Sequence, residues 1–287
     1  SDETSLELCD KWILSKLNQV NIKVAALLKE YKLGESAKLL YEFTWNDFCD
    51  WYVEFAKQRF NNKETKNRQI SEKVLIKVLN DILVMIHPFM PHITEELWHV
   101  LQLKSDKELL SLQKWPTQEN KFVDNKLDNS FQQLFEIIRL IRNLRAELGL
   151  KPSEKVPVYL ISDNDELIDF LKTLVDDIQT LTKSSEVFIF KTNAVDKKEF
   201  AKSFSGIISD LEVYLPFQDF VNIDALKERL TKDLKKVTIE LENLNKRLSN
   251  KNFVDKAPKD IVDECRFKLN EGSVQKERIT KKLELLN

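Results

Sequence analysis

The chain has 287 residues, of which 42% are hydrophobic and 32% are charged, and its formal net charge is −2. This composition predicts a folded protein, because intrinsically disordered chains contain fewer apolar residues. No run approaches the roughly 18 apolar residues of a transmembrane helix, which excludes a membrane span and argues against a membrane partner.

Three widely separated cysteines lack the CxxC spacing of a zinc site and predict a reducing compartment, which we take to be the cytoplasm. They are Cys9, Cys49 and Cys265. The sequence begins SDET and its first Met is Met85, so we expect a piece of a longer polypeptide. Residues 222–287 contain 16 Lys+Arg and 12 Asp+Glu, hence +4, which leaves −6 for the rest.

Residues up to Gly34 predict one long amphipathic helix. Thr4 and Glu7 fit a capping box at its start. Apolar side chains then recur every three or four residues, which places them on one face. They are Leu6, Cys9, Ile13, Leu17, Val20, Val24, Leu27 and Tyr31.

A second helix is predicted over about 36–60, with aromatic side chains on more than one side. One stripe consists of Tyr41, Trp45, Phe48, Tyr52 and Phe55. Phe43 and Trp51 lie off this stripe. Aromatic residues on several sides predict that this helix is central in a bundle.

Three more helices complete a predicted five-helix bundle over residues 1–150. The third ends at His87, before two prolines, and is apolar nearly all round, so we expect it to be buried. Thr94 is predicted to be the N-cap of the fourth, with Glu95 and Glu96 in its first turn. The fifth covers about 128–148.

The spacing of apolar residues changes after residue 150. The runs VPVYLIS, SEVFIF and LEVYLP are rich in β-branched and aromatic residues and predict three short strands. A helix is expected between the first two, over about 165–181. Residues 151–218 are therefore predicted to form a small α/β unit in a mainly α protein.

Residues 219–287 predict an antiparallel coiled-coil hairpin, because two stretches with heptad spacing flank a polar turn. The first contains Ile223, Leu226, Leu230, Leu234, Val237, Leu241, Leu244 and Leu248. The second contains Val262, Cys265, Leu269, Gly272, Lys276, Ile279, Leu283 and Leu286.

Folding the second stretch back on the first gives one predicted register. It pairs Leu248 with Val262, Leu241 with Leu269, Leu230 with Ile279 and Leu226 with Leu283. In this register Gly272 and Lys276 face Val237 and Leu234. Because neither residue fills an apolar seam, we expect the hairpin to bend there.

The sequence carries no recognisable catalytic motif. It has no glycine-rich phosphate loop, no GxSxG and no HExxH. His87, His92 and His99 lie around the turn bounded by two prolines, but the neighbouring Glu95 and Glu96 already suit a helix N-terminus. We therefore predict no catalytic residue and no metal site.

Two groups of cations are candidates for contact with phosphate. The first, between the second and third helices, consists of Lys57, Arg59, Lys63, Lys66 and Arg68. The second consists of Arg139, Arg142 and Arg145, which recur every three residues and so share one side of their helix. The alternatives are a solvated loop and charges that only keep a helix soluble.

The tip of the hairpin, NKNFVDKAPKDIV, places apolar residues among cations. The candidates for nucleic-acid contact here are Lys246, Arg247, Lys251, Phe253, Lys256, Lys259 and Arg266. Phe253 and Val254 either plug the open end of the seam above Leu248 or present a surface on which RNA bases stack.

Four stretches resemble the C-terminal part of the valyl-tRNA synthetases, a family of class I aminoacyl-tRNA synthetases. They are LYEFTWNDFCDWYVEFAK, HPFMPHITEELW, IRNLRAELGLKP and NFVDKAPKDIVDECRFKL, and the likeness runs over the whole chain in the same order. The second stretch is also typical of isoleucyl and leucyl synthetases. The FVDKAP hairpin therefore carries the resemblance to the valine family.

The resemblance implies an anticodon-binding bundle over 1–150, a connecting unit over 151–218 and a tRNA-binding arm over 219–287. The bundle would bind the anticodon stem-loop, and the arm would reach the elbow where the D and T loops meet. The implied candidates for anticodon binding are Lys32, Trp45, Asn46, Asp50 and Trp51.

The family attaches valine to its tRNA with ATP and edits misactivated threonine in a separate domain. Its His-Ile-Gly-His and Lys-Met-Ser-Lys-Ser signatures do not occur in this chain. We therefore expect the chain alone to be inactive and to bind no cofactor, since ATP would bind in the catalytic core of the parent protein. The expected partner is a valine-accepting tRNA, not DNA, and the expected state is a monomer.

Two alternatives stay open on the sequence. A scaffold protein whose hairpin pairs with partner helices would have no affinity for RNA. The equivalent part of an isoleucyl or leucyl synthetase would bind a different tRNA.

Overall fold

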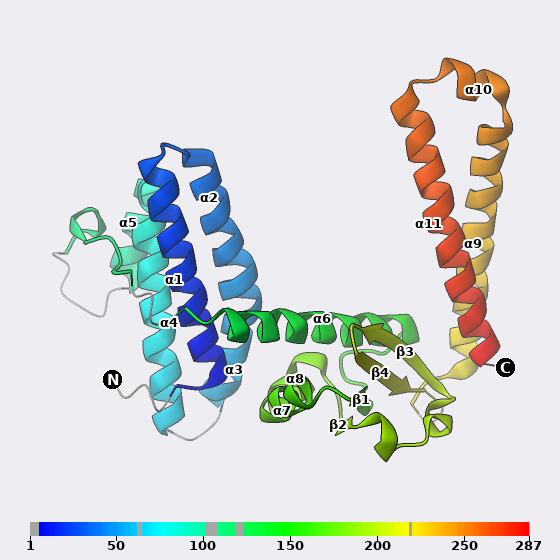
Figure 1. Cartoon of the computed structure of the whole chain (residues 1–287), viewed down its shortest axis with the longest axis horizontal. Helices are drawn as coiled ribbons and strands as arrows, with labels where there is room; N and C mark the ends of the chain where they lie inside the picture. Colours follow the sequence, from blue (N-terminus) through cyan, green and yellow to red (C-terminus); the bar gives the residue numbers. More distant parts are fainter. Residues whose placement is uncertain (1–5, 62–64, 102–107, 119–122, 218–219, 287) are drawn as a thin grey trace. The chain divides into compact units, whose positions relative to one another are not determined.

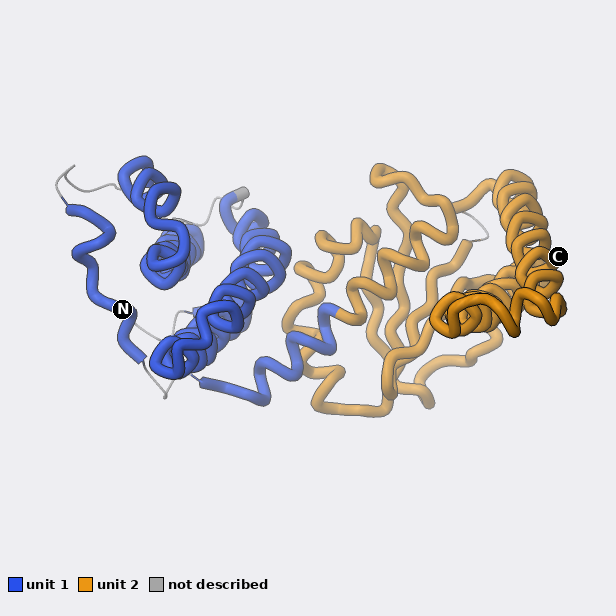
Figure 2. Tube along the Cα trace, turned by 90° about the horizontal axis from the view of Figure 1, so that it is seen from above, with its two compact units in different colours: residues 1–135 blue, residues 136–287 orange. Residues whose placement is uncertain are grey.

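The structure is a computed structural model that describes residues 6–61, 65–101, 108–118, 123–217 and 220–286. Contacts along the chain divide it into two compact units, residues 1–135 and 136–287 (Figure 2). The division falls inside helix α6 (Asn125–Leu148), so the first half of this helix belongs to unit 1 and the second half to unit 2. Within the described residues, no helix is long and apolar enough to cross a membrane.

Unit 1 is a bundle of helices, as predicted. Its elements are α1 (Leu8–Lys29), α2 (Leu33–Glu42), η2 (Phe43–Tyr52), α3 (Val53–Asn61), α4 (Thr65–Ile86), α5 (Pro91–Leu101), η3 (Leu110–Leu112) and the first half of α6. Helices α1, α2 and α4 lie side by side (Figure 1). The mainly α fold class is thereby confirmed.

Stacked aromatic rings form the centre of unit 1. The ring of Trp12 stacks on Phe131 with centroids 5.0 Å apart. Trp51 stacks on Phe135 at 4.0 Å and 11°, and Trp12 meets the same ring edge-on. These side chains come from α1, η2 and α6, so aromatic contacts join the three elements.

The first helix begins later than predicted. Glu7 occupies the N-cap position, and its backbone N–H donates to the carboxylate of Asp10 at 3.1 Å. Thr4 lies outside the described residues, and the predicted capping box between Thr4 and Glu7 is wrong because Glu7 is itself the cap.

The second predicted helix changes its winding in the middle. Its segment η2 is a π-helix of 10 residues, in which hydrogen bonds reach one residue farther than in an α-helix. The predicted aromatic stripe is wrong at Tyr41 and Trp45, whereas the prediction of a central helix with aromatic residues on several sides agrees with the burial of Phe43 and Trp51. Tyr41 and Trp45 are 65% and 56% exposed.

Two predictions for α4 and α5 also need correction. Helix α4 is not buried all round, because Ile76 on one side is 43% exposed. Thr94 is not an N-cap, since α5 already begins at Pro91. The hydroxyl of Thr94 instead donates to the carbonyl of Met90 at 2.8 Å, inside the first turn.

Unit 2 contains a four-stranded sheet with the order β2-β1-β4-β3. Its elements are β1 (Val158–Ser162), α7 (Asp165–Thr173), α8 (Val175–Thr182), β2 (Val187–Phe190), η5 (Thr192–Ala194), η6 (Lys197–Phe200), β3 (Ser203–Ile208) and β4 (Leu211–Pro216). Strand β1 is parallel to β2 and antiparallel to β4, and it pairs Leu160 with both Ile189 and Val213. The predicted helix over about 165–181 is divided at Leu174 into α7 and α8.

Strand β3 is absent from the sequence prediction. Its run SFSGII contains Gly206, and a glycine inside a strand weakens the pattern. The structure gives this glycine a packing role, because a Cβ at Gly206 would lie 2.6 Å from Cδ1 of Leu140 on α6. The second half of α6 therefore lies directly against the sheet.

The last two long helices, α9 (Ile223–Ser249) and α11 (Lys259–Leu285), pack together and are joined by the short helix α10 (Lys251–Lys256) (Figure 1). Each long helix has 27 residues, which corresponds to about 40 Å. Leu230, Val237 and Leu241 are buried from one side of the seam, and Cys265 and Ile279 from the other.

The register near Gly272 differs from the predicted one. A Cβ at this glycine would lie 2.8 Å from Cδ2 of Leu241, so Gly272 lies against Leu241 and not against Val237 and Leu234. Helix α11 continues unbroken through this position. The bend expected here stays a prediction.

Candidate nucleic-acid interface

The cations between the second and third predicted helices do not form one free cluster. Lys57 forms an ion pair with Glu54 at 2.5 Å, and Arg68 with Glu72 at 2.9 Å. Lys63 lies outside the described residues, and Lys66 lies in the first turn of α4. Lys57 and Arg68 thus have acidic partners, and the phosphate contact of this group stays a prediction.

Arg59 belongs to the interior of unit 1. It is 8% exposed, and its guanidinium binds Asp10 at 2.9 Å, Glu7 at 2.6 Å and the hydroxyl of Ser71 at 2.9 Å. The hydroxyl of Tyr52 donates to the same carboxylate of Asp10 at 2.8 Å. The prediction that Arg59 contacts phosphate is wrong, because its donors are already occupied in the core.

The three arginines of α6 do not share one exposed side. Arg139 and Arg142 are exposed, and Arg142 donates to the carbonyl of Leu181 at 3.0 Å. Arg145 is 6% exposed and donates to the carbonyl of Glu154 at 2.8 Å, and burial lowers its pKa. Arg145 is thus a structural residue, and its predicted phosphate contact is wrong.

The candidates for anticodon binding separate into exposed and buried residues. Trp45, Asn46 and Asp50 are exposed on the π-helix η2. Lys32 is exposed at the α1–α2 turn, where Glu30 accepts its hydrogen bond at 2.8 Å and raises its pKa. Trp51 is 5% exposed and stacks in the core, so its predicted contact with the anticodon is wrong.

Sequence reasoning missed an exposed apolar surface beside these candidates. Tyr31 is 88% exposed, Leu33 57% and Tyr41 65%. Tyr31 has a positive φ of 59°, which turns the chain between α1 and α2. Leu33 and Tyr41 are eight residues apart on α2, about two turns, and Trp45 follows at the start of η2. This spacing is the signal that could have found the surface, which we call the α2 face (Tyr31, Leu33, Tyr41 and Trp45).

The hairpin tip has cations without acidic partners. Five of them are exposed, and none forms an ion pair with any residue that the structure describes. They are Lys246, Arg247, Lys251, Lys256 and Lys259. Two exposed acids, Asp255 and Asp260, lie in the same segment, so an excess of positive charge remains. Arg266, farther along α11, is paired with Asp263 at 3.3 Å.

Phe253 lies at the centre of this tip. Its ring is half-buried, and the guanidinium carbon of Arg247 lies 5.3 Å from the ring centroid. The side chain of Asn250 accepts a hydrogen bond from the backbone of Asn252 at 3.0 Å and so begins α10. The short helix thereby holds the ring beside the end of α9.

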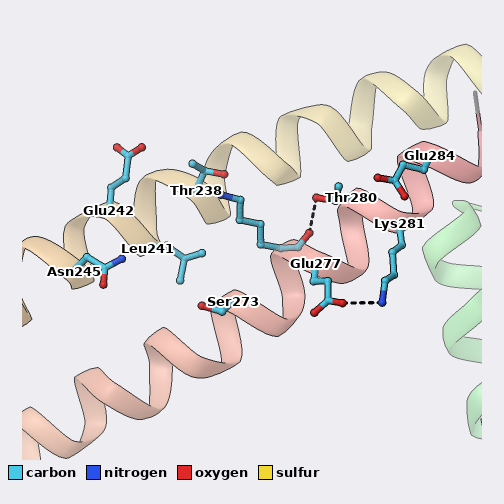
Figure 3. A pocket seen from close by; sticks show the side chains of 10 residues that line it. Thr238, Leu241, Glu242, Asn245, Ser273, Glu277, Thr280, Lys281 and Glu284 are labelled. Atoms are coloured by element: carbon cyan, nitrogen blue, oxygen red, sulfur yellow. Dashed lines mark hydrogen bonds and ion pairs between the residues drawn. The ribbon is translucent and has the colours of Figure 1, made fainter.

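A groove of about 590 Å³ lies between α9 and α11, away from the tip of the hairpin (Figure 3). Thr238 and Leu241 line it from α9, and Ser273 and Lys276 from α11. Its lining residues include no aromatic ring, which makes it a poor site for stacked bases. The groove marks the segment in which polar and small residues interrupt the apolar seam.

The histidines have ordinary polar neighbours. Nδ1 of His87 lies 2.8 Å from the hydroxyl of Thr94, and Nε2 of His99 lies 3.3 Å from Glu95. Within the described part of the chain, no three His, Cys, Asp or Glu side chains are grouped to hold a metal ion.

Comparisons with known proteins match the two ends of the chain to two families. Residues 10–160 match the anticodon-binding domain of tRNA ligase, and residues 222–287 match the valyl tRNA synthetase tRNA binding arm. Over 286 residues the chain is 74% identical to a valine–tRNA ligase of Prochlorococcus marinus subsp. pastoris, a match that covers 100% of this chain and 31% of that protein.

More distant relatives cover the same part. The chain is 40% identical to a valine–tRNA ligase of Synechocystis sp. and 34% identical to one of Petrotoga mobilis, over 98% and 99% of its length, and covers 31% of each. It thus spans about a third of the curated relatives that it matches. The chain belongs to the anticodon-binding-domain family of tRNA ligases, and its last two long helices match the tRNA binding arm of valyl tRNA synthetase.

Proposed function

We propose that this chain is the tRNA-recognition part of a valine–tRNA ligase, an enzyme that attaches valine to its tRNA with ATP. The names of the relatives and the match of the arm support this assignment. The catalytic and editing parts, with the ATP site, lie in the portion of the relatives that this chain does not cover. The chain itself needs no cofactor and acts as a cytoplasmic monomer on tRNA, not on DNA.

We further propose a division of labour among three segments. Residues 1–150 bind the anticodon stem-loop, 151–218 connect, and 219–287 reach the tRNA elbow. The exposed aromatic rings of the α2 face support the first role, because single-stranded bases stack on such rings. Asn46 and Asp50 lie beside that face and supply polar groups for base edges.

The observation that carries the proposal is the group of unpaired cations around Phe253 at the hairpin tip. Exposed cations without acidic partners are free to replace the counterions of phosphate groups. A half-buried ring among them offers a surface for a terminal stacked base pair or a splayed base. A partner helix of a scaffold complex would instead favour an apolar stripe with few uncompensated charges.

The test is the salt dependence of tRNA binding. In fluorescence anisotropy with valine tRNA, Lys251→Glu combined with Lys256→Glu should weaken binding. The slope of log affinity against log salt should flatten by roughly 0.7 to 0.9 for each phosphate group that the variant no longer neutralises. Isoleucine tRNA serves as the comparison for specificity and should bind more weakly to the unchanged chain.

A matched control keeps the charge change and moves it away from the tip. Lys172→Glu combined with Lys198→Glu makes the same change at exposed positions of the α/β part, and should leave affinity and slope unaltered. An unchanged slope for the tip variant would refute the proposed elbow contact. If both variants bound tRNA equally weakly, the loss of affinity would be an effect of net charge and not of the tip.

A further inference from the structure

Helix α5 turns an apolar face to solvent. Met90, Ile93, Leu97, Val100 and Leu101 follow a three- and four-residue spacing and are 40% to 70% exposed. We call these five residues the α5 stripe. Single exposed apolar residues are common, but a contiguous row on one helix marks an interaction surface.

The opposite side of α5 is fixed, so the stripe cannot rotate inward. Thr94 is 3% exposed. The indole of Trp98 donates to the carbonyl of Glu108 at 2.9 Å, and the carboxylate of Glu95 accepts from the backbone of Leu110 at 2.8 Å. The segment held by these bonds adds Leu112, which is 75% exposed, to the apolar surface of unit 1.

The charges around the α5 stripe disfavour RNA as its partner. The helix sequence PHITEELWHVL contains no Lys and no Arg. Its formal charges are those of Glu95, which faces away from the stripe, and Glu96, which is exposed beside Ile93 and Val100 and would repel phosphate. One of its two histidines, His99, already lies beside Glu95. An apolar row beside one acid, on a helix without Lys or Arg, fits a protein surface.

We propose that the α5 stripe packs against the part of the ligase polypeptide that lies outside these 287 residues. This proposal rests on the proposed function, since that function makes the chain one part of a longer ligase. The relatives are about three times as long as the stretch that they share with this chain. The uncovered two thirds therefore supply a partner surface that is always present.

The size of the surface favours such a tethered partner over a free one. A stable interface between separate proteins uses about 20 to 30 residues on each side. The five apolar side chains of the α5 stripe are far fewer. A covalent tether raises the effective concentration of a neighbouring domain to roughly millimolar values, so that a small apolar contact is sufficient.

Hydrogen exchange without tRNA tests the proposal, measured on the complete ligase and on the 287-residue chain. Amides of residues 91–101 should exchange on the order of tenfold more slowly in the complete protein. Ile93→Glu combined with Val100→Glu should remove this difference and leave the melting temperature of the 287-residue chain unchanged. Val274→Glu, at an exposed apolar position of α11, is the control and should leave exchange of α5 unchanged.

Three results would overturn the proposal. Equal exchange of α5 in the two proteins would show that nothing covers the stripe. Protection that rises with the concentration of the 287-residue chain, together with a dimer in sedimentation, would assign the stripe to a second copy. Protection that requires tRNA would assign it to RNA. A complete protein that fails to charge tRNA with valine would refute only the proposed function, because the exchange measurement uses no tRNA.

Discussion

Asp47 lies on the π-helix η2, and burial raises the pKa of its carboxyl group to about 6, against the opposing effect of Lys16. An acid whose pKa is raised by folding stabilises the folded state only while it is protonated. That contribution is complete below the unfolded value of 3.8 and is lost as the pH rises through 6. Near neutral pH, Asp47 therefore carries a charge that the fold does not favour.

The expected result for Asp47→Asn is a stability gain that depends on pH. Thermal unfolding should show little change at about pH 4 and a gain of about 1 to 2 kcal/mol at about pH 7.5, less than the full pKa difference because the side chain keeps some solvent. Asp50→Asn, at an exposed position of the same helix, is the control and should show no such trend. A gain that is equal at both pH values would contradict the burial argument.

Phe253 allows the two interpretations of the hairpin tip to be separated. Leu keeps the apolar volume of a plug but has no ring face on which a base can stack. Phe253→Leu should therefore preserve the melting temperature while tRNA binding weakens by about 1 to 3 kcal/mol. Phe253→Ala should lower both. If Phe253→Leu binds tRNA as tightly as the unchanged chain, the ring of Phe253 only closes the end of the apolar seam and does not stack on a base.

The residue scale also shows what sequence patterns cannot tell. Arg59, Arg145 and Trp51 belong to residue types that suit RNA contact, and the sequence gives no sign that the two arginines point inward. Their burial depends on partners far along the chain, such as Asp10 for Arg59 and Phe135 for Trp51. By contrast, the excess of cations at the hairpin tip is local in sequence and could be predicted.

At the scale of elements, the groove in the hairpin gives a further prediction. Lys276 occupies a position where heptad spacing calls for an apolar side chain, and it lines the groove beside Leu241. Lys276→Leu should fill part of this space and stabilise the hairpin by about 1 kcal/mol through apolar burial. Hydrogen exchange of α9 and α11 should slow accordingly.

The control for this change is Lys235→Leu, because Lys235 is exposed on α9 and does not line the groove. It should leave exchange in the hairpin as it is. Faster exchange in Lys276→Leu would mean that the hollow cannot accept an apolar side chain, and the interpretation of this segment as an unfilled part of the seam would be wrong.

Long elements with a regular period were predictable, and elements with a changed period were not. The bundle and the two long helices of the hairpin follow from spacings of three and four residues. The π-helix η2 (Phe43–Tyr52) breaks that spacing by about one residue per turn, so a stripe continued through it from α-helical spacing misplaces Trp45. Strand β3 escaped prediction because Gly206, which admits the side chain of Leu140, interrupts a short apolar run.

At the scale of the whole molecule, the two surfaces lie on different units, the α2 face on unit 1 and the hairpin tip on unit 2. A tRNA that engages both is held by two contacts joined through one chain, so that each contact raises the effective concentration of the other. The affinity for complete tRNA should then exceed the affinity for either arm of the tRNA alone. The expected stoichiometry is one tRNA per chain.

Shortening the RNA tests this division of contacts. An RNA stem-loop that carries only the valine anticodon arm should bind unit 1, and its affinity should not respond to Lys251→Glu with Lys256→Glu. Trp45→Ala should weaken binding of the stem-loop and of complete tRNA alike, by about 1 to 3 kcal/mol, because both contain the bases that we propose to stack on the α2 face. Trp45→Phe, which keeps a ring, should restore most of the affinity. If the tip variant weakens the stem-loop as much as the complete tRNA, the tip does not act at the elbow, and the assignment of the two surfaces to two regions of tRNA fails.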